Sequence, residues 1–259
     1  MKKIIILSII LLSILGCKTN DPTPDPVTTT SVETSAISFH LHTYIGPNEV
    51  EIYDQVNNTD DGRGISLSFA QLYISNIKLI KLDGGIYNVK DTIILTDIIN
   101  NVYKLGNVPI GNYKSVSFDV GLPSAINAAV PTGNPIKLND PNMWFSNTAE
   151  ANNFIFMHVA GKIDTSIAKS GDDDKMTPFQ YNIGTQSRLM HVAMPDQNVA
   201  VQPNYTAYIH VLVDYAELFK GVDLKDLTNF SVKTKGDNTS NLAIDIAARI
   251  PKMFKYENQ

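Results

Sequence analysis

The sequence predicts an all-β domain, an antiparallel β-sandwich with short helical insertions. Beyond residue 35, short segments alternate apolar and polar side chains, as strands with one buried face do. Glycine, proline, asparagine and aspartate separate these segments, where turns need them. Helical patterns are weak and no internal repeat is visible. Short strands at this spacing favour a sandwich or a barrel of antiparallel strands.

The first 16 residues have the three zones of a signal peptide. Lys2 and Lys3 form a positive start, residues 4–15 are apolar apart from serines, and Gly16 precedes Cys17. This run is shorter than the ~20 residues of a transmembrane helix and has the length of a signal-peptide core. A small residue followed by cysteine at this place resembles the lipobox of bacterial lipoproteins. We interpret residues 1–16 as a signal peptide and Cys17 as the lipidated new N-terminus, with palmitate among its acyl chains; an uncleaved anchor helix is the alternative.

Residues 17–34 are predicted to be a tether rich in proline and threonine. Pro22, Pro24 and Pro26 alternate with polar residues, and threonines follow them. Such a segment favours extended polyproline-like backbone and cannot bury apolar area. The folded domain is therefore predicted at residues 35–259, held to the membrane through the lipid. The expected location is the outer membrane, facing the periplasm or the cell surface.

The composition excludes several classes of function. The net charge is -5 and no Lys/Arg cluster is present, so nucleic acid is not an expected partner. Because the chain has 1 Cys, which the lipid occupies, a disulfide, a thiol nucleophile and a cysteine-ligated metal site are excluded. No Ser/His/Asp set with recognisable flanks, no glycine-rich phosphate loop and no HExxH motif is present. The sequence predicts a binding protein, not an enzyme.

The predicted elements follow from alternation and turn signals. Asp83-Gly84-Gly85 predicts a hairpin, because such turns need residues that tolerate positive φ. Short helical turns are predicted at residues 122–130 and 215–227, the second beginning after Asp214 as a cap. The predicted strands cover residues 36–45, 65–82, 86–97, 115–120, 154–163, 179–183, 188–193, 205–213 and 241–246.

The histidine pair His40 and His42 is the strongest candidate metal site. Residues two apart in a strand point to the same side, so the two imidazoles can converge on one ion, and imidazole suits copper and zinc. A third ligand must come from His158, His191 or His210. The alternative is that the pair stands on the solvent face of an edge strand.

Three further groups of residues are weaker candidates for a site. His158 shares a face with two phenylalanines, which favours a hydrogen-bonded core histidine. Met190, His191 and Met194 together could bind Cu(I), although methionines more often serve as packing material. Three aspartates at residues 172–174 resemble an acidic loop, but a solvated turn is the commoner meaning of such a run.

The order of several segments resembles a known family. A long strand at residues 69–80 is followed by Asp83-Gly84, then by Val-Pro-Ile-Gly-Asn-Tyr at residues 108–113 and Val-Ser-Phe-Asp-Val-Gly at residues 116–121. Asn142-Met-Trp144, Phe-Ile-Phe-Met-His-Val-Ala-Gly at residues 154–161 and Phe-Gln-Tyr-Asn-Ile-Gly at residues 179–184 come next. This succession resembles the MbnP-like domain, a β-rich domain of copper-binding, methanobactin-associated periplasmic proteins, from about residue 35 onward.

The resemblance implies copper held by histidines, with a His-x-His pair early in the domain. His40 and His42 fall at the place of that pair, and His210 is the expected third ligand. Two departures from the family pattern are visible: the sole tryptophan, Trp144, is far from the pair in sequence, and Asn182 replaces a family histidine. The resemblance also implies a di-haem peroxidase-like partner or a TonB-linked transporter.

Two functions follow as hypotheses. The first is a membrane-anchored extracytoplasmic copper-binding protein for copper uptake or handling. The second is a metal-free surface lipoprotein for adhesion or glycan handling, with exposed aromatic rings as the binding platform. The rings considered for that platform are Tyr44, Tyr53, Tyr73, Tyr103 and Trp144.

Overall fold

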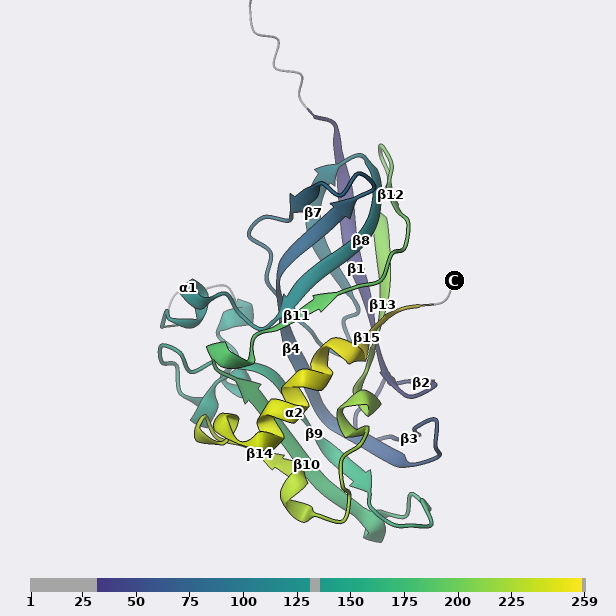
Figure 1. The fold of residues 1–259 in the computed structure, drawn as a ribbon, viewed down its shortest axis with the longest axis vertical. Coiled ribbons are helices and arrows are strands. Elements are labelled where there is room, and N and C mark those ends of the chain that lie inside the picture. The colour runs from purple at the N-terminus through teal and green to yellow at the C-terminus, as the bar shows by residue number, and fades with distance from the viewer. Residues whose placement is uncertain (1–31, 131–135, 258–259) are drawn as a thin grey trace, which may run out of the picture. The chain divides into compact units, whose positions relative to one another are not determined.

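Two curved sheets contain the strands of the described chain, which comprises residues 32–130 and 136–257 of the computed structural model (Figure 1). The predicted signal peptide, Cys17 and nearly all of the predicted tether lie outside these residues. The smaller sheet has the order β15-β13-β1-β2, with β7 also paired to β1. Its strands are β1 (Thr34–Ile45), β2 (Asn48–Glu49), β7 (Val102–Pro109), β13 (Ala207–Asp214) and β15 (Phe254–Tyr256).

The larger sheet is built around β4 (Gly64–Lys81), which pairs with β8 along one half and with β9 along the other. The pairing register shifts between Leu67 and Phe69 and again between Ser75 and Lys78, so the buried side of β4 changes along its length. The other strands are β3 (Val56–Asn58), β5 (Ile86–Asn88), β6 (Ile94–Leu95), β8 (Gly111–Val120), β9 (Ile155–Asp164), β10 (Met176–Gly184), β11 (Met190–Ala193), β12 (Val199–Val201) and β14 (Ser231–Val232).

Helical segments are short and few among the described residues. The α-helices are α1 (Ser124–Asn127) and α2 (Asn241–Arg249). The 3-10 segments are η1 (Ile136–Leu138), η2 (Pro141–Met143), η3 (Phe145–Asn147), η4 (Asp173–Lys175), η5 (Gln186–Arg188), η6 (Tyr215–Phe219), η7 (Leu227–Phe230), η8 (Gly236–Thr239) and η9 (Ile250–Met253). None of the helices in the described ranges is long and apolar enough to cross a membrane. The predicted all-β class with short helical insertions is confirmed.

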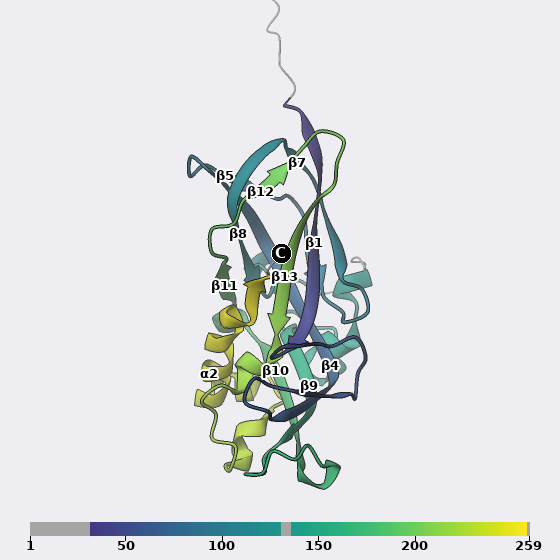
Figure 2. The same cartoon turned by 90° about the vertical axis from the view of Figure 1, so that its right-hand side faces the viewer.

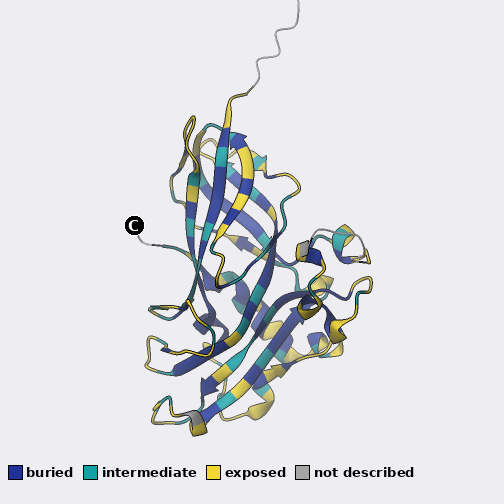
Figure 3. Ribbon diagram, turned by 180° about the vertical axis from the view of Figure 1, so that it is seen from behind, coloured by how far each residue is buried: buried dark blue, intermediate teal, exposed yellow. Residues whose placement is uncertain are grey.

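The two sheets meet through apolar side chains of the main core. Phe39 of β1 packs edge-on against Phe118 of β8, with ring centroids 5.7 Å apart. Phe118 in turn contacts Phe254 of β15, at 5.0 Å. Figure 3 shows the resulting alternation of buried and more exposed residues along the strands. Since the odd-numbered positions of β1 face this core, its even-numbered positions face the other way.

Most strand pairs are antiparallel, as predicted, but two are parallel. β10 pairs with β14 in this way, and so does β1 with β13. Figure 2 shows β1 and β13 running side by side. This second parallel pair positions the candidate site.

The local turn predictions are confirmed at two places. Gly84 has a φ of 86° and the Gly85 amide donates to Asp83 Oδ1 at 2.8 Å, in the hairpin between β4 and β5. Asp214 caps η6, since its Oδ1 accepts from the Ala216 amide at 3.0 Å.

The predicted strand at residues 241–246 is wrong, because this segment forms the beginning of helix α2. Leu242, Ile244 and Ile246 alternate with other residues, which mimics a strand, but the buried positions are Ala243, Ile246 and Ala247. That spacing of three and four is helical. Ser240 caps the helix by accepting from the Ala243 amide at 3.2 Å, and this cap outweighs the apparent alternation.

Candidate metal centre

His40 and His42 lie on the side of β1 that faces away from the main core. Phe39 and Leu41, which flank them, are buried on the opposite side. β1 is not an edge strand: β13 pairs with it on one side, and β2 and β7 pair with it on the other. Both histidines are half-buried, and the His42 side chain is only 12% exposed. The part of the alternative that placed the pair on an edge strand is therefore wrong.

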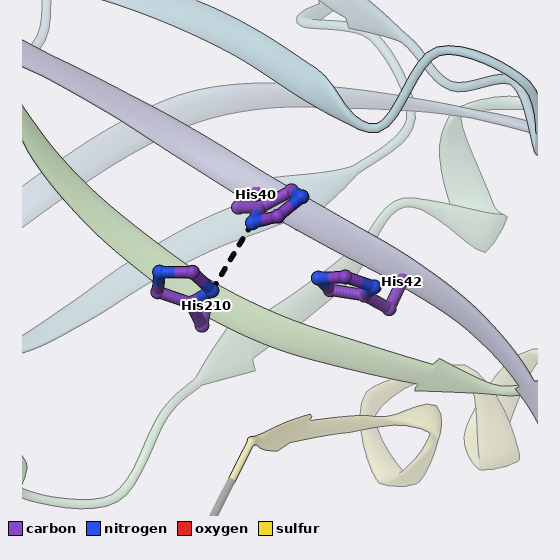
Figure 4. A group of neighbouring side chains, drawn as sticks. All are labelled: His40, His42 and His210. Atoms are coloured by element: carbon purple, nitrogen blue, oxygen red, sulfur yellow. Dashed lines mark hydrogen bonds between the residues drawn. The ribbon is translucent and has the colours of Figure 1, made fainter. Parts of the chain in front are cut away.

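His210 joins the pair through the parallel register of β1 and β13. The register pairs His40 with His210, and residues so paired project from the same side of a sheet. The Nδ1 atoms of His40 and His210 are 3.1 Å apart (Figure 4). One candidate ligand atom from each of the three histidines lies within 4.8 Å of the others. Of the three histidines considered as the third member, the structure brings His210 to the pair.

Two carboxylates border the histidines on the same side of the sheet. Glu49 in β2 is paired with Tyr44, two residues beyond His42, and its Oε1 is 2.5 Å from His42 Nδ1. Glu257 follows β15, and its Oε2 is 3.4 Å from His210 Nδ1 and 3.8 Å from His42 Nε2. The group therefore spans four neighbouring strands.

His42 Nε2 is buried and has no hydrogen-bond partner. A buried polar atom without a partner is uncommon in folded proteins. The hydrogen bond from Nδ1 to Glu49 fixes the tautomer that carries its proton on Nδ1, so Nε2 presents a lone pair. In Figure 4 the edge of the His42 ring that points away from its own strand faces the space beside His40 and His210. A carboxylate behind one ring nitrogen and a free lone pair on the other is the usual arrangement of a metal-binding histidine.

The surroundings of His40 favour its neutral form. Burial lowers the pKa of His40, and the neighbouring His42 and His210 lower it further, against a smaller opposing effect of Glu257 and Glu49. A metal ligand must be a neutral imidazole, so this shift extends the binding-competent form of His40 toward lower pH.

The spacings fit one small cation after a modest closure. Two ligand atoms at about 2.0 Å from an ion lie about 3.3 Å apart in a tetrahedral arrangement and can never exceed about 4 Å. The 3.1 Å between His40 and His210 is already at such a spacing. The candidate ligand atoms of the three histidines lie up to 4.8 Å apart, which exceeds the limit of about 4 Å. Side-chain rotation must therefore bring the outermost nitrogen inward. Neutral imidazoles of this kind suit copper and zinc.

The other sequence candidates have local structural roles. His158 packs against Phe69 with ring centroids 4.4 Å apart, and its Nδ1 bonds the Asn142 carbonyl at 2.9 Å, as a hydrogen-bonded core histidine should. His191 pairs with Asp119 at 2.9 Å and is 57% exposed. Neither belongs to the histidine group described above.

The methionines and aspartates next to those positions behave as ordinary packing and surface residues. Met194 is buried in the main core, and Met190 packs against that core. Asp172 and Asp174 are exposed, and Asp174 pairs with Lys175. These observations agree with packing methionines and a solvated acidic turn.

Three of the five rings considered for an aromatic platform are buried. Tyr73 is inaccessible to solvent, and Tyr103 and Trp144 are each 9% exposed. Trp144 belongs to a small apolar cluster that contains no residue of β1. The platform hypothesis is therefore wrong for these residues, and Trp144 does not complete the histidine group. The Asn182 amide donates to the Lys233 carbonyl at 3.1 Å, a structural bond.

Glu49 and Glu257 are the site residues that sequence reasoning missed. Gly46 follows the strand at residues 36–45 and is a turn signal. It could have predicted the hairpin of β1 and β2, which brings Glu49 back beside the histidine pair. Glu257 gives no comparable signal, because it follows a three-residue strand whose partner is distant in sequence.

Comparisons with known proteins agree with the fold. No curated protein matches the chain. The solved structure of MbnP from Methylosinus trichosporium is similar, with a TM-score of 0.52 and 15% sequence identity, over 74% of this chain and 80% of that one. At this identity the likeness concerns the fold alone. The MbnP family model, in contrast, matches the sequence itself over residues 34–246, which is most of the chain. The chain belongs to the MbnP family.

Proposed function

We propose that this protein is a membrane-anchored, extracytoplasmic copper-binding protein whose ion is held by His40, His42 and His210. The observation that carries the proposal is the convergence of the three imidazoles, with His42 Nε2 buried and unpartnered beside the other two. Membership of the MbnP family supports copper over zinc, since the resemblance to MbnP-like domains implies copper.

The residues divide into those that bind and one that orients. His40 and His210 would offer Nδ1, and His42 would offer Nε2, while Glu49 holds the His42 ring through Nδ1. Three neutral imidazoles leave an open position on a four-coordinate ion. The proposed role is copper uptake or handling, with no catalytic step.

The lipid anchor is proposed from the N-terminal sequence. Residues 1–16 would be removed, Cys17 would carry the acyl chains, and the tether would hold the domain beside the outer membrane, in the periplasm or on the cell surface. The test is Cys17→Ser in the native host: the wild type should partition with detergent and take up labelled palmitate, whereas the variant should do neither. Membrane association of the variant equal to that of the wild type would refute the anchor.

Copper binding is tested by titration of the purified full-length protein with Cu(I) and with Cu(II). The wild type is compared with the double variant His40→Ala/His42→Ala, and His191→Ala is the matched control, because His191 lies outside the group. The double variant should lose high-affinity copper binding, and the control should keep it. Equal binding by the double variant and the wild type would end the proposal.

The physiological partner is a second proposal that the family resemblance supports. A di-haem peroxidase-like protein or a TonB-linked transporter would meet the copper protein at the membrane. Cross-linking in cells that carry the lipidated protein, followed by identification of the linked proteins, would test this, and the absence of both kinds of partner would contradict it.

A further inference from the structure

We propose that Glu257 is a fourth ligand of this centre and that it makes the site select Cu(II) over Cu(I). The inference rests on the proposed copper-binding function and deepens it, by naming the oxidation state that the site prefers. It concerns a residue outside the part of the chain that the family model matches, residues 34–246.

The backbone places Glu257 directly beside His210. β15 pairs antiparallel with β13, with Tyr256 opposite Val211, and the Glu257 amide continues this ladder by donating to the His210 carbonyl at 3.3 Å. Glu257 is thus the next residue in the register and stands opposite His210. Residues opposite each other in a ladder project from the same side of the sheet, so the carboxylate shares the face of the three histidines.

The carboxylate oxygen already lies at the spacing of ligand atoms around one ion. Glu257 Oε2 is 3.4 Å from His210 Nδ1, close to the ~3.3 Å edge of a tetrahedral site with bonds of about 2.0 Å. It is 3.8 Å from His42 Nε2, the buried nitrogen without a hydrogen-bond partner. The same atom therefore lies near two of the three candidate nitrogens.

Glu49 and Glu257 have different places in this arrangement. Glu49 bonds His42 Nδ1 and so orients the ring, while the candidate ligand atom of His42 is its other ring nitrogen, Nε2. Glu257 lies near Nε2 and near His210 Nδ1, on the side where the ion would be held. Glu49 is a positioning residue, and Glu257 is a ligand.

A carboxylate changes which ion the site prefers. Carboxylate oxygen is a harder donor than imidazole, and it favours divalent ions over the soft Cu(I). The two carboxylates also contribute two negative charges beside three neutral imidazoles, which balances the charge of Cu(II) and exceeds that of Cu(I). Both effects favour Cu(II).

The test compares Glu257→Gln with the wild type in the full-length protein. Glu150→Gln is the matched control, because Glu150 is exposed in the loop before β9 and outside the histidine group. The affinities for Cu(II) and Cu(I) are measured separately by competition with chelators, and the EPR spectrum of the Cu(II) form is recorded. We expect Glu257→Gln to lower the Cu(II) affinity at least about tenfold and the Cu(I) affinity by less than about threefold.

The EPR spectrum separates ligation from a distant charge effect. Loss of an oxygen ligand should shift the g and copper hyperfine values of Glu257→Gln, while Glu150→Gln keeps the wild-type spectrum. An unchanged spectrum overturns the assignment, even where affinity falls, and so do equal losses of Cu(I) and Cu(II) affinity. If the wild type binds copper and Glu257→Gln binds it equally well, only this inference is refuted. If the wild type binds no copper, the proposed function is refuted as well.

Discussion

His40 and His210 stand opposite each other in the parallel pairing of β1 and β13, with their Nδ1 atoms 3.1 Å apart although 170 positions separate them in the sequence. This contact depends on the register of the two strands, because a shift of one residue would turn His210 toward the core. Phe39, the neighbour of His40 in β1, packs against Phe118 behind the sheet, and this buries one face of β1 and leaves His40 on the other. The packing of the core therefore builds the site.

Removing His210 alone should weaken copper binding strongly. Changes to residues outside the ligand set of metal sites cost about 10- to 100-fold in affinity, and loss of a ligand should cost at least as much. His210→Ala, measured by chelator competition, should therefore bind copper at least about 10-fold more weakly than the wild type. His158→Ala is the control, since His158 lies in the larger sheet, where it bonds Gln180 of β10 and the Asn142 carbonyl of η2. Unchanged binding by His210→Ala would remove His210 from the site.

Glu49→Gln should weaken copper binding without removing a ligand. The carboxylate at 2.5 Å from His42 Nδ1 fixes the tautomer and the orientation of the ring, and an amide does this less well. We expect a loss of about 10-fold in copper affinity with the number of coordinated imidazoles unchanged. Pulsed EPR counts the imidazoles and competition gives the affinity. A loss of one imidazole, or full wild-type affinity, would contradict the positioning role.

The metal-free protein should lose stability as the pH falls, in part through His40. Burial, followed by His42 and His210, lowers the pKa of His40 in the folded state. Below the unfolded-state value of about 6.5 the unfolded chain binds a proton that the folded chain does not, so the free energy of unfolding decreases as the pH falls. In urea unfolding with EDTA, the decrease between neutral and mildly acidic pH should be smaller for His40→Asn than for the wild type.

A residual pH dependence is expected in His40→Asn. His158 also has a lowered pKa, mainly because of burial, and acts in the same direction. The prediction therefore concerns the difference between the two proteins. Identical pH dependence of unfolding in the wild type and in His40→Asn would contradict it.

Gly161→Ala should destabilise the larger sheet. A Cβ at Gly161 would lie 2.0 Å from the Ser66 carbonyl oxygen, in the tight pairing of β9 with β4. Backbone cannot move aside cheaply, and overpacking of this kind costs about 2 kcal/mol or more in the free energy of unfolding. Gly236→Ala is the control, because its nearest neighbour would be at 3.6 Å. Urea unfolding of both variants is the measurement, and equal stabilities would show that the clash is relieved.

The sequence predicted the parts of this protein that depend on local patterns. Alternation along residues 36–45 placed His40 and His42 on one face, and the Asp83-Gly84 signal predicted the hairpin between β4 and β5. Alternation misled at residues 241–246, where three apolar residues two apart also fit a helix with Ala243 and Ala247 buried. In that segment the Ser240 cap was the better signal.

The parts that depend on strand order are not encoded by local patterns, although His210 was correctly expected as the third ligand. Which of three histidines joins the pair depends on the parallel register of β1 and β13, and no local pattern encodes it. The position of Glu257 depends on β15 adding to the edge of β13, a pairing of three residues. Its carboxylate could be placed only after that pairing was known.

Coordination of one equivalent of Cu(II) by the full-length protein tests the central claim most directly. Pulsed EPR of the wild type should show coupling to three imidazoles, and His210→Ala should show two. Coupling to fewer than three imidazoles in the wild type, or the same count after removal of His210, would contradict a centre built from His40, His42 and His210.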